Sequence, residues 1–273
     1  MDLRKLEGEH GFALGYCVQG SGPLLFLVGA PAGISEFAGI ATKLDHSFTV
    51  VTHDPRGVGA SQISGDYSTT PELLAGDLLS LIRSMTDEPV LIFGASGGAV
   101  TGLALLAAHP EAVLHLVLHE PPLFGLLPEG MELLARMDIA FRTAADDPDA
   151  GMQMFADLTE TFQTTYEAAP RPKPIKLPPG TPAERARNRF FLNAMAPATV
   201  RYHPLTERLP GDHILIAAGE ASIGQPARRA AEALAGAFDT SVIESPGNHL
   251  GMILEAERFG EWLMETLRTI RAG

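Results

Sequence analysis

One short segment combines a serine with small neighbours in a pattern that suits nucleophilic chemistry. The sequence Gly94-Ala95-Ser96-Gly97-Gly98 follows an apolar run with strand character, Val90-Leu-Ile-Phe93, and opens an apolar stretch with helical spacing. A G-x-S-x-G pattern in this context predicts a sharp, strained turn that only small flanking residues allow. The turn would hold the serine hydroxyl near the positive end of a helix. We therefore predict Ser96 to be a nucleophile, with a chance turn in a glycine-rich chain as the alternative.

A serine nucleophile needs an adjacent base, because its hydroxyl is a poor nucleophile alone. The segment Pro246-Gly247-Asn248-His249-Leu250 lies between the last strand-like run and the last helix-like run. A loop there would return to the same sheet edge as Ser96, and imidazole titrates in the right range for a general base. We predict that His249 is this base. The alternative is a structural or solvated histidine, since the chain has nine.

Strands and helices must alternate along most of the chain to place these residues. Short apolar runs have strand character, and they span 12–19, 24–29, 48–53, 90–93, 114–119, 214–218 and 241–244. Runs with helical spacing lie between most of them, at 35–44, 71–85, 97–109, 226–237 and 255–270. This alternation predicts an α/β fold with a largely parallel sheet that helices cover on both faces.

The alternation stops between Pro121 and Pro210. This stretch is rich in Met, Phe, Ala and Arg at helical spacing, and its proline-dense piece at 170–179 cannot be regular helix. We predict a mainly helical cap over residues 121–210, inserted into a core of residues 1–120 and 211–273. An insertion at the carboxyl ends of parallel strands would cover the usual ligand crevice.

Composition narrows the class of protein. A net charge of −13 disfavours nucleic acid as a partner, and the single cysteine, Cys17, excludes a disulfide within the chain. No Cys/His cluster has zinc-like spacing, and we expect neither a metal nor an organic cofactor.

The first residues show no apolar signal-peptide core, so we expect a cytoplasmic protein. Val90–Ala108 is uncharged and long enough to cross a bilayer, but its five glycine and serine residues favour a buried strand, turn and helix.

The order of these segments resembles that of the α/β-hydrolase superfamily. The run Leu25–Gly29 leads into Ala30-Pro-Ala-Gly33, and Asp54-Pro-Arg-Gly-Val-Gly-Ala-Ser61 resembles the family's D-x-R-G-x-G-x-S turn. The elbow and the Gly-Asn-His loop follow in the family's order, so residues 12–120 and 210–270 carry the resemblance. It implies an α/β-hydrolase fold with a serine, histidine and acid triad.

The acid departs from the commonest family pattern. Members usually carry an aspartate in G-x-x-D after the penultimate strand, but here that place reads Gly219-Glu220-Ala221-Ser222. Glu120, directly after the strand-like run at 114–119, is our preferred acid, and the alternatives are Glu220, another acid, or a dyad without an acid. Zearalenone lactonases and haloalkane dehalogenases resemble this arrangement, since both use a glutamate at the end of that strand. The lactonases also share the serine and a His-Glu-x-Pro sequence, matched here by His119-Glu-Pro-Pro122.

Two backbone N–H groups should hold the developing oxyanion. Gly97 follows the nucleophile and supplies one. The loop after Gly29 resembles the family's H-G-G-P-G and supplies the other, which we assign to Ala30 because Pro31 has no N–H. We interpret Asp54 and Arg56 as parts of a tight structural turn, with a role in substrate binding as the alternative. The methionine and phenylalanine residues of the cap fit either core packing or an apolar binding surface, and they include Met131, Met137, Met152, Met154, Phe155 and Phe162.

These residues predict a serine hydrolase that cleaves a carboxylic ester or lactone of a small, moderately apolar molecule. Carbon–carbon bond hydrolysis or perhydrolysis on the same triad is the alternative reaction, and halide displacement would need a carboxylate at position 96. A ligand receptor on the same fold is the non-enzymatic alternative. We expect no membrane partner, and the sequence leaves open whether the chain forms a homodimer.

Overall fold

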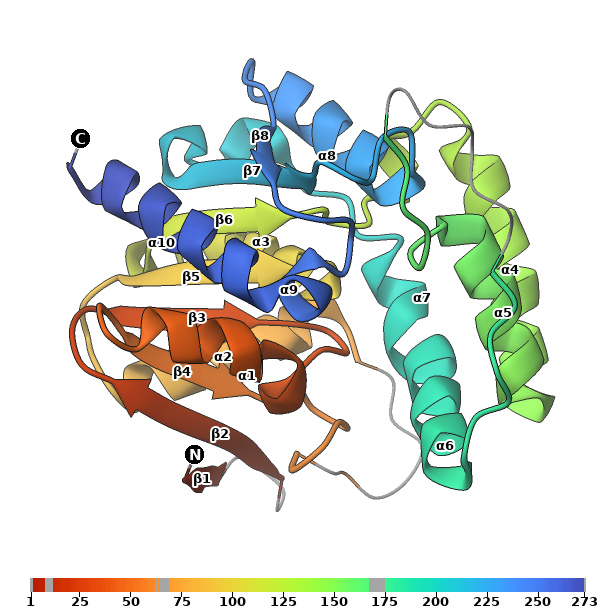
Figure 1. The fold of residues 1–273 in the computed structure, drawn as a ribbon, viewed down its shortest axis with the longest axis horizontal. Helices are drawn as coiled ribbons and strands as arrows, with labels where there is room; N and C mark the ends of the chain where they lie inside the picture. The colour runs from red at the N-terminus through yellow and green to blue at the C-terminus, as the bar shows by residue number, and fades with distance from the viewer. Residues whose placement is uncertain (1, 8–11, 62, 64–68, 167–174, 273) are drawn as a thin grey trace.

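The computed structural model describes residues 2–7, 12–61, 63, 69–166 and 175–272. Of the proline-dense piece predicted at 170–179, residues 170–174 lie outside the described part, and residues 175–179 are non-helical as expected. Eight strands form one sheet in the order β1-β2-β4-β3-β5-β6-β7-β8 (Figure 1). The pairs β1/β2 and β2/β4 are antiparallel and the other neighbours are parallel, which confirms the predicted sheet.

The strands follow the sequence runs closely. They are β1 (Leu3–Glu7), β2 (Ala13–Gly20), β3 (Leu24–Val28), β4 (Thr49–His53), β5 (Val90–Ala95), β6 (Val113–His119), β7 (Ile214–Gly219) and β8 (Ile243–Ser245). Strand β1 was not predicted, because its sequence LRKLE is mostly charged and exposed. It is a strand because it pairs with β2, with Leu3 opposite Cys17, at the edge of the sheet.

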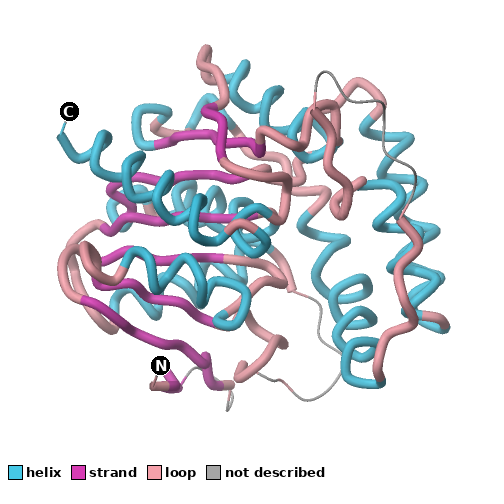
Figure 2. Tube along the Cα trace, viewed as in Figure 1, coloured by secondary structure: helices cyan, strands magenta, loops and turns pink. Residues whose placement is uncertain are grey.

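Helices cover both faces of the sheet, as the alternation predicts (Figures 1 and 2). One face carries α1 (Ile34–Leu44), α9 (Gly251–Leu254) and α10 (Ala256–Ala272), and Phe37 and Phe259 are buried there. The other face carries α2 (Pro71–Arg83), α3 (Gly97–Ala108) and α8 (Pro226–Ala237). The helix predicted for 255–270 corresponds to α10, which begins one residue later, at Ala256. The short helix α9 precedes it, and Glu255 separates the two.

The uncharged stretch Val90–Ala108 is β5 followed by α3. Almost every side chain of α3 is buried, so its uniform apolarity reflects a position inside the core. Among the described residues, no helix has the length and hydrophobicity that a membrane crossing requires.

The insertion, residues 121–210, is helical wherever the structure describes regular elements in it. It contains the short 3₁₀ turns η3 (Phe124–Leu126) and η5 (Thr206–Arg208), the helices α4 (Gly130–Asp146), α5 (Pro148–Thr159), α6 (Pro182–Phe190) and α7 (Ala196–Thr199), and a π-helical turn at Phe191–Met195. Polar caps begin two of these helices: Asp147 accepts from the N–H groups of Asp149 and Ala150, and Thr181 forms a capping box with Glu184.

The methionines of the insertion differ in environment. Met137 is fully buried in the core, whereas Met131 is 81% exposed, so of the two interpretations left open, core packing holds for Met137 and not for Met131. Met152 and Phe155 lie in between: both are partly buried and line a cavity described below.

Candidate active site

Ser96 occupies a strained turn between β5 and α3. Its backbone φ of 53° lies in the left-handed region, and its N–H donates to the carbonyl oxygen of His119 at 2.9 Å. A side chain at Gly98 would place its Cβ 2.0 Å from the carbonyl oxygen of Val28, so only glycine lets α3 start this close to β3. The half-buried Ser96 thus stands at the carboxyl end of the sheet, as the pattern predicts.

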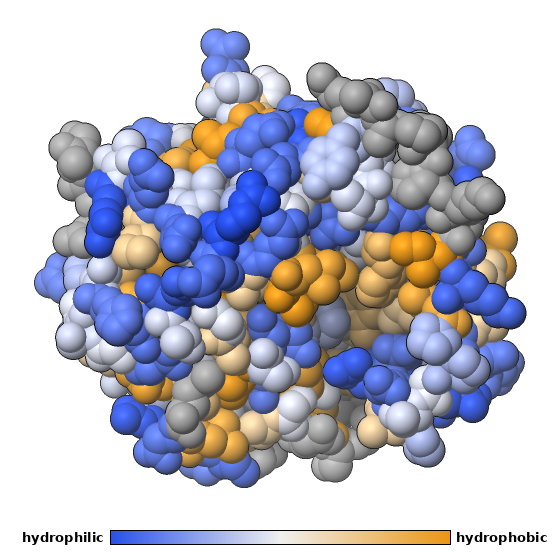
Figure 3. Space-filling view, viewed as in Figure 1, coloured by the Kyte–Doolittle hydropathy of each residue, from blue (hydrophilic) through white to orange (hydrophobic). Residues whose placement is uncertain are grey.

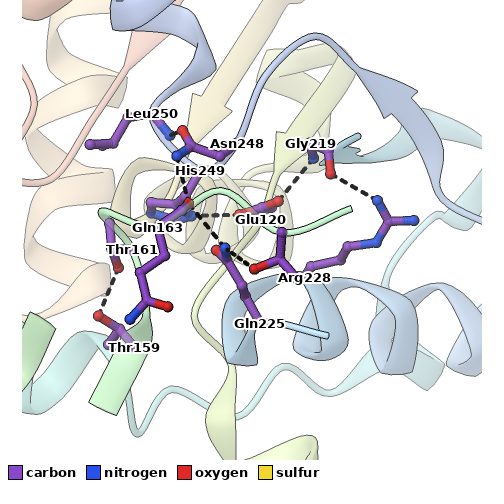
Figure 4. Close-up of polar contacts among 11 residues, drawn as sticks. Glu120, Thr159, Thr161, Gln163, Gly219, Gln225, Arg228, Asn248, His249 and Leu250 are labelled. Atoms are coloured by element: carbon purple, nitrogen blue, oxygen red, sulfur yellow. Dashed lines mark hydrogen bonds and ion pairs between the residues drawn. The ribbon is translucent and has the colours of Figure 1, made fainter. Parts of the chain in front are cut away.

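Glu120 contacts His249 directly. Its Oε2 atom lies 2.7 Å from Nδ1 of His249, and its Oε1 atom accepts the backbone N–H of Gly219 at 2.9 Å (Figure 4). The Glu120 backbone has a φ of 46°, another left-handed residue, which turns the chain sharply after β6. The structure therefore places the preferred acid of the sequence analysis within hydrogen-bond distance of the histidine.

Glu120 is ionised despite complete burial. Burial by itself raises the pKa of this carboxyl, but the hydrogen bond and charge of His249, with the N–H of Gly219, outweigh it and bring the pKa to about 2. An ionised carboxylate only accepts hydrogen bonds, so Nδ1 of His249 carries a hydrogen, and in the neutral imidazole Nε2 then holds the lone pair. This is the tautomer that a general base requires.

The two alternative positions for the acid do not reach His249. Glu220 accepts a hydrogen bond from Arg258 at 2.9 Å and is half-buried. Ser222, at the usual aspartate position, is fully buried, and its Oγ has no hydrogen-bond partner among the described residues. The loop after β7 therefore supplies no carboxylate to the histidine.

Ser96 and His249 both line one cavity. No hydrogen bond joins the Ser96 hydroxyl to His249 in this structure, although both residues are fully described. Catalytic hydrogen bonds are often long or misaligned without substrate and tighten once it binds. The serine and the histidine are thus brought to the same cavity without being hydrogen-bonded there.

His119 lies beneath this pair and stays neutral. It is fully buried, neither ring nitrogen has a hydrogen-bond partner among the described residues, and burial lowers its pKa to about 4. Its ring packs against Phe259, with centroids 5.3 Å apart, and lies 6.2 Å from the ring of His249. His119 therefore acts as a buried aromatic packing residue beneath the site.

The two predicted oxyanion donors are neighbours in space. A Cβ atom at Gly97 would lie 2.3 Å from the carbonyl oxygen of Ala30, so the missing side chain lets the loop after β3 approach the elbow. Both residues line the cavity with Ser96, and neither backbone N–H donates to another described residue. The two N–H groups are therefore available to an oxygen bound beside Ser96.

The cavity has a volume of about 300 Å³ and lies between the core and the insertion. A hollow opens in this region of the visible surface, with apolar residues beside it (Figure 3). Its lining is mainly apolar and comes from both parts of the chain, including Pro122, Phe124, Met152, Phe155, Phe162, Phe191, Met252 and Ile253. A few polar groups face it, among them Thr159, Thr161 and Asn188.

A profile of the alpha/beta hydrolase fold matches residues 22–172, more than half of the chain. The chain belongs to the alpha/beta hydrolase fold family. Over 94% of its length it is 29% identical to an uncharacterized hydrolase, YraK, of Bacillus subtilis (strain 168), of which it covers 93%. The protein is therefore a hydrolase.

Two further proteins show the range of this similarity. A fluoroacetate dehalogenase of Burkholderia sp is 32% identical over a segment that spans 49% of this chain and 46% of the dehalogenase. The structure of a thermophilic esterase from Thermogutta terrifontis superposes with a TM-score of 0.71, at 20% identity, over 99% of both chains. At that identity the superposition establishes the shared fold alone.

Asp54 and Arg56 of this hydrolase hold the turn after β4. The Asp54 carboxylate accepts the backbone N–H groups of Ile34 and Ala60, both at 2.8 Å. Arg56 makes a bidentate ion pair with Asp77: Nε donates to Oδ2 at 2.8 Å and Nη2 donates to Oδ1 at 2.5 Å. Neither residue lines the cavity, in agreement with the structural interpretation.

The sequence analysis missed the residues that tie the insertion to the histidine loop of the hydrolase. Asn248 donates from Nδ2 to the carbonyl oxygen of Gln163 at 2.7 Å, and its Oδ1 accepts the N–H of Leu250 at 2.9 Å (Figure 4). Gln225 donates to the same carbonyl oxygen at 3.1 Å. The position of Asn248 next to His249 was the only sequence signal for this role.

A metal centre would need several ligands in one place. Over the residues that the structure describes, no group of three or more His, Cys, Asp or Glu side chains lies close enough to hold a metal ion.

Proposed function

We propose that this protein is a serine hydrolase that cleaves a carboxylic ester or lactone through an acyl-enzyme on Ser96. The observation that carries the proposal is the 2.7 Å contact between the buried, ionised Glu120 and Nδ1 of His249. This contact orients an imidazole whose other nitrogen is a base, at the cavity that Ser96 shares.

In the proposed first step, His249 Nε2 takes the proton of the Ser96 hydroxyl as Oγ attacks the substrate carbonyl carbon. The N–H groups of Gly97 and Ala30 hold the oxyanion of the tetrahedral intermediate. His249 then returns the proton to the leaving alcohol, and the carbonyl re-forms as the acyl-enzyme. A water molecule, deprotonated by His249, releases the acid and restores Ser96. Glu120 stays ionised throughout and stabilises the imidazolium.

The cavity supports a small, moderately apolar substrate. Its volume of about 300 Å³ is at the low end for small-molecule sites, and its mainly apolar wall includes aromatic and methionine side chains. We propose that the insertion acts as a cap, because α5, α6 and the π-helical turn contribute side chains to that wall. A lactone substrate is supported by the sequence resemblance of the Glu120 arrangement to the lactonases.

The dehalogenase similarity does not extend to a displacement reaction at position 96. Displacement of a halide needs a carboxylate nucleophile, and serine stands here. Carbon–carbon bond hydrolysis and perhydrolysis use the same triad as ester cleavage, so the panel below includes substrates for both.

A fluorophosphonate probe and a substrate panel test the proposal together. The wild type should be labelled at Ser96, located by mass spectrometry of the peptides, and should turn over p-nitrophenyl esters or lactones. Ser96→Ala should lose both labelling and turnover, whereas Ser80→Ala, an exposed serine on α2, should keep both. Labelling without turnover on any ester, lactone, β-diketone or peracid-forming assay would support a receptor and contradict the proposal.

A further inference from the structure

Arg228 is a buried cation on α8, which is otherwise rich in alanine. Its side chain is 7% exposed, and all three donor groups of the guanidinium are engaged. Nε donates to Glu232 at 2.8 Å, Nη2 donates to Glu244 at 2.7 Å, and Nη1 donates to the carbonyl oxygen of Gly219 at 2.8 Å. Burying a guanidinium is costly unless it is paired in this way.

Gly219 connects this arginine to the proposed catalytic acid. Its carbonyl oxygen accepts from Arg228, and its N–H donates to Oε1 of Glu120 at 2.9 Å (Figure 4). A Cβ at position 219 would lie 2.5 Å from the carbonyl oxygen of Gly247, so the glycine also packs against the loop that carries His249. Gly219 therefore stands between Arg228 on one side and Glu120 with the histidine loop on the other.

The orientation of the Glu120 carboxylate depends on this glycine. Of the two carboxylate oxygens, Oε1 is held by Gly219 and Oε2 faces Nδ1 of His249. If the Gly219 N–H moved, the carboxylate would be free to rotate, and Oε2 would lose its alignment with the imidazole. A misplacement of about 1 Å at a catalytic group can cost about 100-fold in rate.

We propose that Arg228 is a positioning residue for the catalytic acid, which it holds in place through Gly219. The inference rests on the proposed function. Arg228 does not line the cavity and so does not touch substrate. Its charge is balanced by Glu232 and Glu244, so it acts on Glu120 by fixing geometry rather than by adding a field.

A double-mutant cycle separates this role from a general structural one. In the wild-type background, Arg228→Gln should lower kcat on a p-nitrophenyl ester by about 10- to 100-fold with KM nearly unchanged. In the Glu120→Gln background the same substitution should lower kcat by less than about 3-fold, because the alignment it maintains is already lost. The acid limb of the kcat/KM–pH profile should move to lower pH in both single variants, since each weakens the support of the imidazolium.

Matched variants complete the experiment. Arg229→Gln, which removes the exposed neighbour that pairs with Glu129, should leave kcat unchanged. Arg228→Lys should recover part of the activity, because a lysine can donate to the Gly219 carbonyl oxygen but cannot bridge both glutamates at once. Should Arg228→Gln fail to fold, Glu244→Ala gives a milder test: it removes one exposed acceptor of the arginine and should lower kcat in the wild-type background only.

Equal losses of kcat in both backgrounds would overturn the proposal, and so would a lowered melting temperature with kcat unchanged. Full activity in Ser96→Ala or Glu120→Gln would instead overturn the proposed function itself. The two failures are therefore distinguishable.

Discussion

Glu120 and His249 are 129 residues apart in the sequence, yet Oε2 of the first lies 2.7 Å from Nδ1 of the second. The acid comes from the end of β6 and the histidine from the loop after β8, and β7 lies between these strands in the sheet. Glu120 bridges that gap because its backbone takes a left-handed turn and its side chain is supported by Gly219 at the end of β7.

Removing the Glu120 charge should nearly abolish activity. In Glu120→Gln the amide cannot stabilise the imidazolium, and a loss of about 10⁴-fold in kcat is the scale set by the analogous change in a serine protease. Glu220→Gln should change kcat less than 2-fold, because Glu220 contacts Arg258 and not His249. Steady-state kinetics on one ester measures both, and the reverse ranking would show that the acid lies on the loop after β7.

Ser222→Ala should leave both kcat and the free energy of unfolding nearly unchanged. The Ser222 hydroxyl is buried without a hydrogen-bond partner among the described residues, so its removal relieves an unsatisfied polar group. We expect the free energy of unfolding to stay within about 1 kcal/mol of wild type or to rise, with kcat unchanged. Urea denaturation provides the measurement. A drop of several kcal/mol would mean that the hydroxyl makes an interaction absent from the structure.

Folding stability should fall as the pH drops from about 6.5 to 4. Burial lowers the pKa of His119 and of His53 to about 4 in the folded protein, so both stay neutral while the unfolded chain binds protons below its ordinary value of 6.5. Stability is therefore full above pH 6.5 and declines toward pH 4, by roughly 3 kcal/mol per histidine. Glu120, with its pKa lowered to about 2, adds a further loss as the pH falls below 4.5.

Urea denaturation at a series of pH values checks this dependence. His119→Leu should show a shallower decline between pH 6.5 and 4 than the wild type, whatever its stability at pH 7. His46→Gln alters an exposed histidine and should retain the wild-type slope. Equal slopes in wild type and His119→Leu would show that His119 is protonated in the folded state.

Asn248→Ala should loosen the tie between the insertion and the histidine loop. The substitution removes the bond to the Gln163 carbonyl oxygen and the one from the Leu250 N–H, while Gln225 retains its own bond to Gln163. We expect a loss of about 1–3 kcal/mol in the free energy of unfolding and a fall in kcat of about 10-fold. Thermal denaturation and ester kinetics measure the two effects. A stability loss with kcat unchanged would confine Asn248 to a structural role.

Much of the architecture follows from local patterns. Seven of the eight strands were predicted, because most of them are buried parallel strands that form continuous apolar runs, and the helices between them have clear spacing. Strand β1 escaped prediction since its charged sequence becomes a strand only by pairing with β2. The environments of Met131 and Met137 stayed open for a related reason: spacing places a residue on a helix face, but packing decides whether that face is covered.

The sequence by itself determined the nucleophile turn, the histidine loop, and the absence of an aspartate at the usual place, because each depends on residue types at close spacing. It also favoured Glu120 over Glu220 as the acid, on the strength of a family resemblance. Only the tertiary structure showed that Glu120, and not Glu220, contacts His249, because the contact depends on which strand end faces the histidine. It also joined Arg228, Gly219 and Gln163 to the site, since hydrogen bonds through backbone atoms leave no trace in side-chain identity.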